Sequence, residues 1–370
     1  MPAKSELKAL TGVRFIAAFY VFVFHIDLHT PLTFLPDWIQ VVVHQGALGV
    51  NFFFVLSGFL LAYSHLQDFA ESNKMTTGYY RWFLFKRFSR IYPVYFAGLL
   101  LSLVVSMLFG QRPPAYIILL NTLMLEAYTW WLAFWWYGTM AWSVSAEFFF
   151  YLLFPLLLPV LLGIRSERLV WVVLIGVCLL SALPGLMHNI SPTWVPMNLQ
   201  YAFPPLRLAE FIAGMLTAIL VFKFKMRVPS WIGVAAVTAL VVWLVVLGPY
   251  LKGGVIHNII VVPGLALLLA NLSQPEPASV WRWLGSSLLV YLGRISYSFY
   301  ITQFCLMFAL EQLSSQPGVT LPSYVVLGSM LLFNLLLAAL FFKVVEQPSH
   351  KWLLTFGTKY IKASERLIAA

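Results

Sequence analysis

The sequence predicts an all-α integral membrane protein with about ten transmembrane helices. Of its 370 residues, 61% are hydrophobic and only 10% are charged, and the mean hydropathy is +0.86. Apolar runs of about twenty residues, the length that crosses a bilayer as a helix, recur along nearly the whole chain. The polar stretches between them, at most roughly 25 residues long, are too short to bury a core of their own. We therefore expect one membrane-embedded domain over 1–370, surrounded by lipid.

The apolar segments define the expected order of the helices. They lie at 13–28, 47–66, 83–109, 141–163, 169–187, 203–222, 230–248, 255–272, 286–310 and 323–344. The aromatic-rich stretch 116–137, which carries Glu126, is too irregular for a span. We expect it to form a re-entrant element packed against protein, where non-helical backbone at membrane depth is tolerated.

The positions of Lys and Arg predict the orientation. With the N-terminus in the cytoplasm, 20 of the 23 basic residues fall on the cytoplasmic side, and only Arg112, Arg207 and Lys252 fall outside. Counting 116–137 as a full span would reverse every later loop and remove this bias. Both termini are then cytoplasmic, and the basic tail 345–370 is expected to form a short amphipathic helix on the anionic inner leaflet. The net charge of +10 thus reflects topology, and we expect no nucleic-acid partner.

Neither a signal peptide nor a metal site is indicated. No small-x-small cleavage site follows the run 13–28, so we expect it to remain as the first helix. Cys178 and Cys305 both lie in apolar runs, where packing is the simplest role. No disulfide framework or metal-ligand spacing is present in the sequence.

A cation and an imidazole share one face of the first helix. Arg14 and His25 are eleven residues apart, so their directions differ by roughly 20° and they lie about 16 Å apart along the axis. Such residues are costly inside a membrane and mark a functional site by default. The alternative is a histidine bonded to a carbonyl beside a snorkelling arginine. Asp27 and Asp37 could orient the imidazole, although Asp27 would point about 200° away on a continuous helix.

Three further ionisable residues lie in or beside apolar spans. Arg87 and Arg90 share a helix face, and their guanidinium forks suit phosphate oxygens, although flanking positive charge is the alternative. Glu147 lies one turn after Ser143 and needs either a partner or a proton. It is a candidate site residue, with a structural ion pair to a buried arginine as the alternative.

Two other groups have structural interpretations. Small residues in the second apolar segment favour close helix packing, namely Gly49, Ser57 and Gly58. Asn51 in the same segment could line a cavity. Arg207 and Glu210, at i,i+3, suggest a local salt bridge rather than a catalytic pair.

Six blocks in register resemble acyltransferase family 3, the membrane O-acyltransferases of glycans and other acceptors. They are Leu-x-Gly-x-Arg with a later His at 10–25, Gly-Val-x-x-Phe-Phe-x-Leu-Ser-Gly-Phe at 49–59, Arg-x-x-Arg-Ile-Tyr-Pro at 87–93, a Trp-Ser…Glu…Phe-Tyr block at 142–151, Leu-Gly-x-Ile-Ser-Tyr-x-x-Tyr at 292–300, and Val-Glu-x-Pro at 345–348. The chain departs from the family pattern at Gln303, where a His is usual, and at Phe148–Phe149, where a polar pair is usual.

The resemblance implies transfer of acetyl from cytoplasmic acetyl-CoA to a hydroxyl of an exported or cell-surface polysaccharide, or of its lipid-linked precursor. It implies a stand-alone enzyme of the bacterial inner membrane, without an esterase-like domain and without a metal. In this scheme the CoA phosphates bind Arg14, Arg87 and Arg90. His25 is the general base or a transient acetyl carrier, and Glu147 orients the acceptor or the histidine. The expected acceptor-site residues are Asp37, Asn51, Trp142 and Ser143.

Two other classes of function stay open at this point. Buried Arg, Glu and His on about ten helices also suit a transporter of an anionic or glycan-related substrate. A non-catalytic partner in a glycan-export complex would bind no CoA. The sequence shows no inverted repeat and no matched pair of broken helices, which counts against the transporter.

Overall fold

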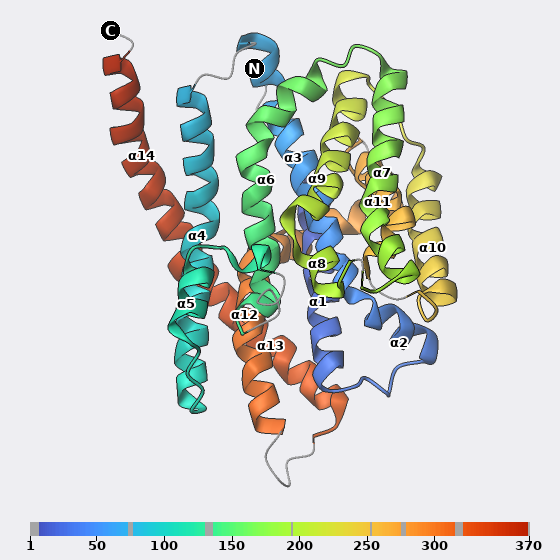
Figure 1. Ribbon diagram of the computed structural model, residues 1–370, viewed down its shortest axis with the longest axis vertical. Coiled ribbons are helices and arrows are strands. Elements are labelled where there is room, and N and C mark those ends of the chain that lie inside the picture. The colour runs from blue at the N-terminus through green and yellow to red at the C-terminus, as the bar shows by residue number, and fades with distance from the viewer. Residues whose placement is uncertain are drawn as a thin grey trace.

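The regular structure is helical throughout the part of the chain that can be described. The computed structural model describes residues 7–72, 77–129, 136–193, 195–251, 254–274, 279–314 and 321–368. These residues contain helices and no strand, as the sequence predicted. Both ends of the chain lie at the same end of the bundle in Figure 1, as an even number of crossings requires.

Nine helical segments in the described ranges are long and apolar enough to cross a membrane. The first five are Lys8–His29 (α1), Gly46–Leu66 (the turn Gly46–Leu48 with part of α3, Gly49–Ser72), Gly78–Leu108 (in α4, Thr77–Leu108), Met140–Leu162 (in α6, Gly138–Leu162) and Glu167–Ile190 (α7). The other four are Met197–Phe222 (α8, Met197–Ala202, with α9, Pro204–Ala218), Ser230–Leu247 (α10), Val255–Leu272 (with α11, Asn258–Leu272) and Ser323–Thr358 (α13, Ser323–Phe341, with part of α14, Gln347–Ile368). The further span expected at 286–310 is α12 (Ser287–Ser314), which has 28 residues. It is too polar to be counted with the nine segments above. Its Ser296, Ser298 and Thr302 are buried inside the bundle.

Short helices begin where the sequence places proline. Pro36 precedes α2 (Asp37–His44) and Pro114 precedes α5 (Ala115–Thr122), both with extended backbone angles. A helix start is where the missing N–H of proline costs least, because that group has no intrahelical partner. The described part of 116–137 contains α5 and a single turn, Glu126–Tyr128, and neither is long enough to cross a bilayer. The remainder, 130–135, falls outside the described residues.

Two close helix contacts hold the centre of the bundle, α1 against α12 and α3 against α9. At Gly58 in α3, a Cβ atom would lie 1.9 Å from the carbonyl oxygen of Phe211 in α9. Gly214 in α9 approaches the carbonyl oxygen of Val55 equally closely. Only glycine permits this separation, which confirms the packing role expected for Gly58. The outer helices α10 and α13 bury few of their apolar side chains and leave most of them partly or fully exposed, as lipid-facing helices do.

The C-terminal tail is helical and follows the last span directly. A π-helical segment, Phe342–Glu346, joins α13 to α14 without a break. In Figure 1, α14 then runs beside α4. Gly357 in α14 permits this approach, because a Cβ there would lie 2.2 Å from the Phe85 ring and 2.9 Å from that of Trp82. Helix α4 is therefore in contact with both α14 and α12.

Candidate active site

Four of the predicted site residues line one cavity, here called the arginine cavity. Arg14 comes from α1, Arg87 and Arg90 from α4, and Glu147 from α6, and the cavity they enclose has a volume of about 270 Å³. Tyr297 of α12 completes the group. Topology predicted only that the three arginines lie on the cytoplasmic side, and it did not place Glu147 beside them. The structure brings them together in space.

The positive charges of the three arginines in the cavity are not neutralised by direct ion pairs. None of them forms an ion pair with a carboxylate among the residues whose side chains are described. The Arg87 guanidinium lies 5.8 Å from the ring of Tyr151 and 5.5 Å from that of Phe83, and its Nε is buried without a hydrogen-bond partner in the described structure. A buried donor without a partner is costly, so the cavity is suited to an anionic ligand that supplies the missing acceptor.

Glu147 is held by two hydroxyl groups. The Ser57 hydroxyl donates to its Oε1 at 2.8 Å, and the Tyr151 hydroxyl donates to the same oxygen. The carboxylate also interacts electrostatically with Arg14 and Arg87, but it pairs directly with neither. Ser57, which we expected to serve only helix packing, is therefore part of the cavity's polar network.

Sequence reasoning did not select Glu346 as a site residue, although its block carried part of the family resemblance. Glu346 is buried at the end of the π-helical segment and accepts a hydrogen bond from Ser298 Oγ at 2.6 Å. It interacts electrostatically with Arg90 and Arg14. A buried acidic side chain at an interrupted helix was the available signal, because π-helical turns concentrate at functional sites.

His25 lines a second and larger cavity, here called the histidine cavity, with a volume of about 650 Å³. That volume is in the range of small-ligand sites. The polar and aromatic side chains around it come from α1, α2 and the residue after it, α6, α8 and α12. They include His29, His44, Gln45, Trp142, Asn198, Tyr201, Tyr300 and Glu311. The His25 ring is half-buried and packs against Phe24, with ring centroids 5.1 Å apart.

The expected acceptor-site residues separate into two groups. Trp142 lines the histidine cavity, and Ser143 Oγ lies 2.7 Å from the hydroxyl of Tyr300, which also lines it. Asp37 is exposed at the start of α2 and does not line this cavity. Asn51 is buried behind the cavity. Neither Asp37 nor Asn51 is placed to touch a ligand beside His25.

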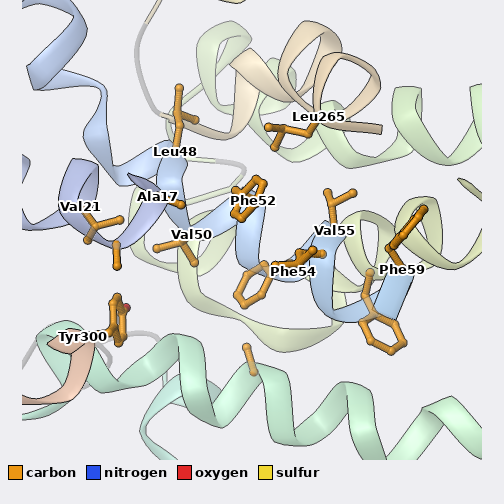
Figure 2. Packing of buried hydrophobic residues seen from close by; sticks show 14 of the residues in the cluster. Ala17, Val21, Leu48, Val50, Phe52, Phe54, Val55, Phe59, Leu265 and Tyr300 are labelled. Carbon is orange, nitrogen blue, oxygen red and sulfur yellow. The ribbon is translucent and has the colours of Figure 1, made fainter. Parts of the chain in front are cut away.

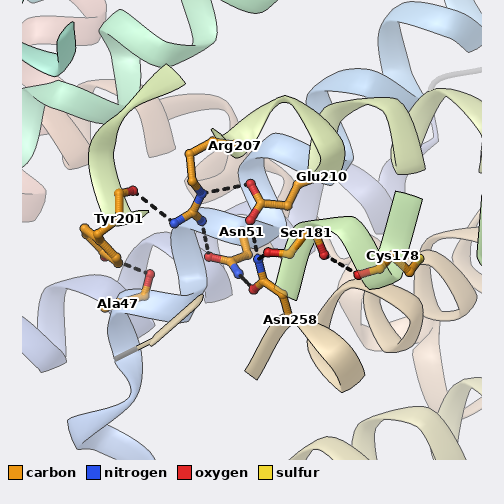
Figure 3. A network of polar contacts seen from close by, with 8 residues as sticks. All are labelled: Ala47, Asn51, Cys178, Ser181, Tyr201, Arg207, Glu210 and Asn258. Carbon is orange, nitrogen blue, oxygen red and sulfur yellow. Dashed lines mark hydrogen bonds and ion pairs between the residues drawn. The ribbon is translucent and has the colours of Figure 1, made fainter. Parts of the chain in front are cut away.

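Asn51 belongs to a buried network that supports the cavity wall (Figure 3). Arg207 donates to Glu210 Oε2 at 3.0 Å, to Asn51 Oδ1 at 2.7 Å and to the Tyr201 carbonyl at 3.0 Å. Asn258 donates to the other Glu210 oxygen at 2.5 Å. The expected Arg207–Glu210 salt bridge is confirmed. Its guanidinium also stacks near the rings of Trp142 and Tyr201, at 5.8 and 5.5 Å, so this network positions two side chains of the histidine cavity.

A pair of aromatic rings separates the two cavities. Phe53 lines the arginine cavity and Tyr300 lines the histidine cavity, and their ring centroids lie 6.2 Å apart in an edge-to-face arrangement. Figure 2 shows Tyr300 across from Val21 and Val50, which line the same cavity as His25. The helix face that carries Arg14 and His25 therefore connects two cavities that meet at this aromatic pair.

The fold and the cavities define a multi-pass helical membrane protein with a cationic cavity and an imidazole-bearing cavity on one helix face. A sequence model of the family described as "Acyltransferase domain" matches residues 7–343, and the chain belongs to this family, acyltransferase family 3. It is 28% identical over 326 residues to "Acyltransferase MdmB" of Streptomyces mycarofaciens, covering 82% of this chain and 79% of that protein. It is 23% identical over 373 residues to "O-acetyltransferase OatA" of Staphylococcus aureus, covering 93% of this chain but only 57% of that protein. No solved structure matches significantly.

Proposed function

We propose that this membrane acyltransferase is an O-acetyltransferase that moves acetyl from acetyl-CoA to a hydroxyl of an exported or cell-surface polysaccharide, or of its lipid-linked precursor. The observation that carries the proposal is the division of one helix face between two cavities. Arg14 faces the cationic cavity, and His25 faces the larger cavity beyond the Phe53–Tyr300 contact. A donor and an acceptor would thus approach the same helix from opposite sides.

The arginine cavity supports the assignment of the donor. Arg14, Arg87 and Arg90 offer unpaired guanidinium groups, which bind phosphate oxygens in bidentate fashion. The cavity is too small for a whole CoA molecule, so the phosphates would bind at its mouth and the pantetheine arm would extend inward. The spacing of about 16 Å along α1 suits such an extended arm. CoA is a substrate here, and the mechanism uses no metal.

His25 carries the chemical step. Its imidazole would take the proton of the acceptor hydroxyl while the hydroxyl oxygen forms a bond to the thioester carbon and the carbon–sulfur bond breaks. The proton then passes to the thiolate, which leaves as CoA thiol. In a variant of this mechanism, His25 first accepts the acetyl group itself. Glu147 would act from the arginine cavity by holding Ser57 and Tyr151 and by setting the local charge.

The histidine cavity supports a glycan acceptor. Its walls combine the aromatic faces of Trp142, Tyr201 and Tyr300 with polar side chains, a combination that packs against the apolar faces of sugar rings and binds their hydroxyls. The similarity to a protein named O-acetyltransferase supports acetyl as the group transferred. The charge bias of the loops supports an orientation with the arginine cavity toward the cytoplasm. The bacterial sources of the relatives support a bacterial inner membrane.

The transfer is tested by mass spectrometry of cell-surface glycan from cells that express the wild-type protein or His25→Ala. The proposal predicts acetylated sugars with the wild type and none with His25→Ala at equal protein levels. Labelled acetyl-CoA supplied to membranes separates the alternatives. A transporter or a non-catalytic partner would consume no thioester and would label no glycan.

A further inference from the structure

Asp27 is turned away from His25 and toward α2, where it meets His44. The Asp27 side chain is 3% exposed, and its Oδ2 lies 2.6 Å from His44 Nδ1. Its other oxygen accepts a hydrogen bond from the backbone N–H of Leu32 at 2.9 Å. The contact is not aligned as a hydrogen bond in the structure. A carboxylate this close to Nδ1 nevertheless favours the neutral tautomer with its proton on that nitrogen, which leaves the lone pair on Nε2.

His44 is presented to the same cavity as His25. It is the last residue of α2, and the Tyr20 hydroxyl of α1 fixes this helix by donating to the Val42 carbonyl at 2.6 Å. The His44 side chain is 63% exposed and lines the histidine cavity. The contact joins a buried carboxylate to an exposed imidazole, so it differs from the fully exposed ion pairs that contribute little to stability. The arrangement instead matches the way a buried carboxylate orients a catalytic imidazole.

Three histidines line this cavity, His25, His29 and His44, and His25 and His44 differ in one respect. His44 has a carboxylate partner, whereas His25 forms no hydrogen bond with a described residue and contacts the ring of Phe24. His25 lies on the face of α1 that leads to Arg14, and His44 lines the same cavity from α2 with a side chain that is 63% exposed. An imidazole without a carboxylate can present either nitrogen for acylation. An imidazole held at Nδ1 presents only Nε2, which can act as a base or as a nucleophile. His25 shares its helix face with Arg14 and the proposed donor, so the role of nucleophile falls to His25.

We propose that these two histidines divide the reaction: His25 carries the acyl group, and His44, positioned by Asp27, takes the proton of the acceptor hydroxyl. This inference rests on the proposed function and selects between its two mechanisms. First, a ring nitrogen of neutral His25 bonds to the acyl carbon, the carbon–sulfur bond breaks, and the proton on the other ring nitrogen passes to the thiolate.

In the second step the acceptor oxygen bonds to the acyl carbon and the carbon–nitrogen bond to His25 breaks. The hydroxyl proton passes to His44 Nε2 and then to the ring of His25, so both imidazoles end neutral. The sum is one thioester and one alcohol converted to one ester and one thiol. His44 touches the acceptor, and Asp27 acts through His44 as a positioning residue.

The test uses the full-length protein in lipid nanodiscs with radiolabelled acetyl-CoA and the glycan fraction of the host cell as acceptor. CoA thiol release, label on the protein and label on the glycan are followed by rapid quenching. The wild type is expected to release thiol and to label the glycan. His44→Ala is expected to release about one equivalent of thiol, to retain label on the protein and to label the glycan ~100-fold more slowly.

Three matched variants sharpen the result. His25→Ala is expected to release no thiol and to retain no label. Asp27→Asn is expected to release one equivalent of thiol and to label the glycan about tenfold more slowly, within the range of acid–base effects. Gln40→Ala, in the same helix but outside the cavity, is expected to match the wild type. His44→Gln keeps a polar side chain of similar size, and it replaces His44→Ala if that variant unfolds.

Two outcomes would overturn the division of roles. One is glycan labelling by a folded His44 variant within about twofold of the wild type. The other is a folded His44 variant that binds acetyl-CoA normally yet releases no thiol, because His44 would then act on the donor. Failure of the wild type itself to release thiol would contradict the proposed function instead.

Discussion

Phe53 and Tyr300 meet edge to face, with ring centroids 6.2 Å apart, and each lines a different cavity. Tyr300 is fixed by its hydroxyl, which donates to the Met140 carbonyl at 2.8 Å and lies 2.7 Å from Ser143 Oγ. The two rings therefore separate the cationic cavity from the cavity that holds His25. In the proposed reaction, the thioester meets the acceptor at this contact, where water must be kept out.

Shrinking the Phe53 ring is predicted to let water reach the thioester. In Phe53→Ala, hydrolysis of acetyl-CoA without acceptor should rise several-fold relative to transfer, as measured by thiol release with and without glycan. Phe52→Ala is the control, since Phe52 is buried but lines neither cavity. It is expected to lower stability without changing that ratio. An unchanged ratio in Phe53→Ala would show that the contact does not exclude water.

Removing the Arg87 charge is predicted to weaken binding of the donor. A hydrogen bond to a charged group contributes about 1.5–3 kcal/mol, so Arg87→Gln should raise the Kd for CoA by ~10- to 100-fold. Arg81→Gln is the matched control, because Arg81 is exposed on the same helix and does not line the arginine cavity. Isothermal titration with CoA measures both. Equal affinities of the two variants would contradict a phosphate site at Arg87.

A single methyl group at Gly58 is predicted to destabilise the bundle. The Cβ of Gly58→Ala would lie 1.9 Å from the Phe211 carbonyl oxygen, so α3 and α9 must separate, at a cost of about 1–3 kcal/mol. Gly176→Ala in α7 meets nothing within 4 Å and should stabilise the protein by ~0.5–1 kcal/mol through helix propensity. Thermal unfolding in detergent would show opposite shifts of Tm. A Tm for Gly58→Ala equal to the wild type would show that the helices do not pack this closely.

Glu126, outside the membrane-spanning segments, is predicted to make stability depend on pH. Burial raises the pKa of its carboxyl from 4.5 to about 8, although the Tyr95 hydroxyl donates to Oε1 at 3.1 Å. The folded protein thus binds a proton that the unfolded chain releases above pH 4.5. Stability from this group is full below that pH and is lost as the pH rises through about 8.

The check is the Tm of wild type and Glu126→Gln between pH 5 and 9. The wild type should lose stability across this range, and Glu126→Gln, which keeps a neutral partner for Tyr95, should show a flatter profile. Glu167→Gln, exposed at the start of α7, is expected to retain the wild-type slope. Parallel profiles for wild type and Glu126→Gln would show that the Glu126 carboxyl is already ionised in the fold.

Features encoded by local periodicity were predictable from the sequence. The lengths of the apolar runs predicted the helices, and the eleven-residue spacing predicted that Arg14 and His25 share one face. The partners of these residues were not predictable, because they come from other helices. Asp27 follows His25 by only two residues, yet it pairs with His44 across a turn. Asn51 was expected at a ligand site, but it accepts a hydrogen bond from Arg207, which lies 156 residues later in the sequence. Such pairings depend on how the helices cross in space, and the local sequence pattern does not determine the crossing.

In the proposed reaction, acetyl passes along the α1 face from a donor beside Arg14 to an acceptor beside His25. The decisive experiment uses membrane vesicles of known orientation that receive labelled acetyl-CoA on one side only. We expect labelled glycan only when acetyl-CoA is on the cytoplasmic side, and we expect His25→Ala to abolish labelling while CoA still binds. Labelling from the opposite side, or full transfer by His25→Ala, would contradict the proposed reaction.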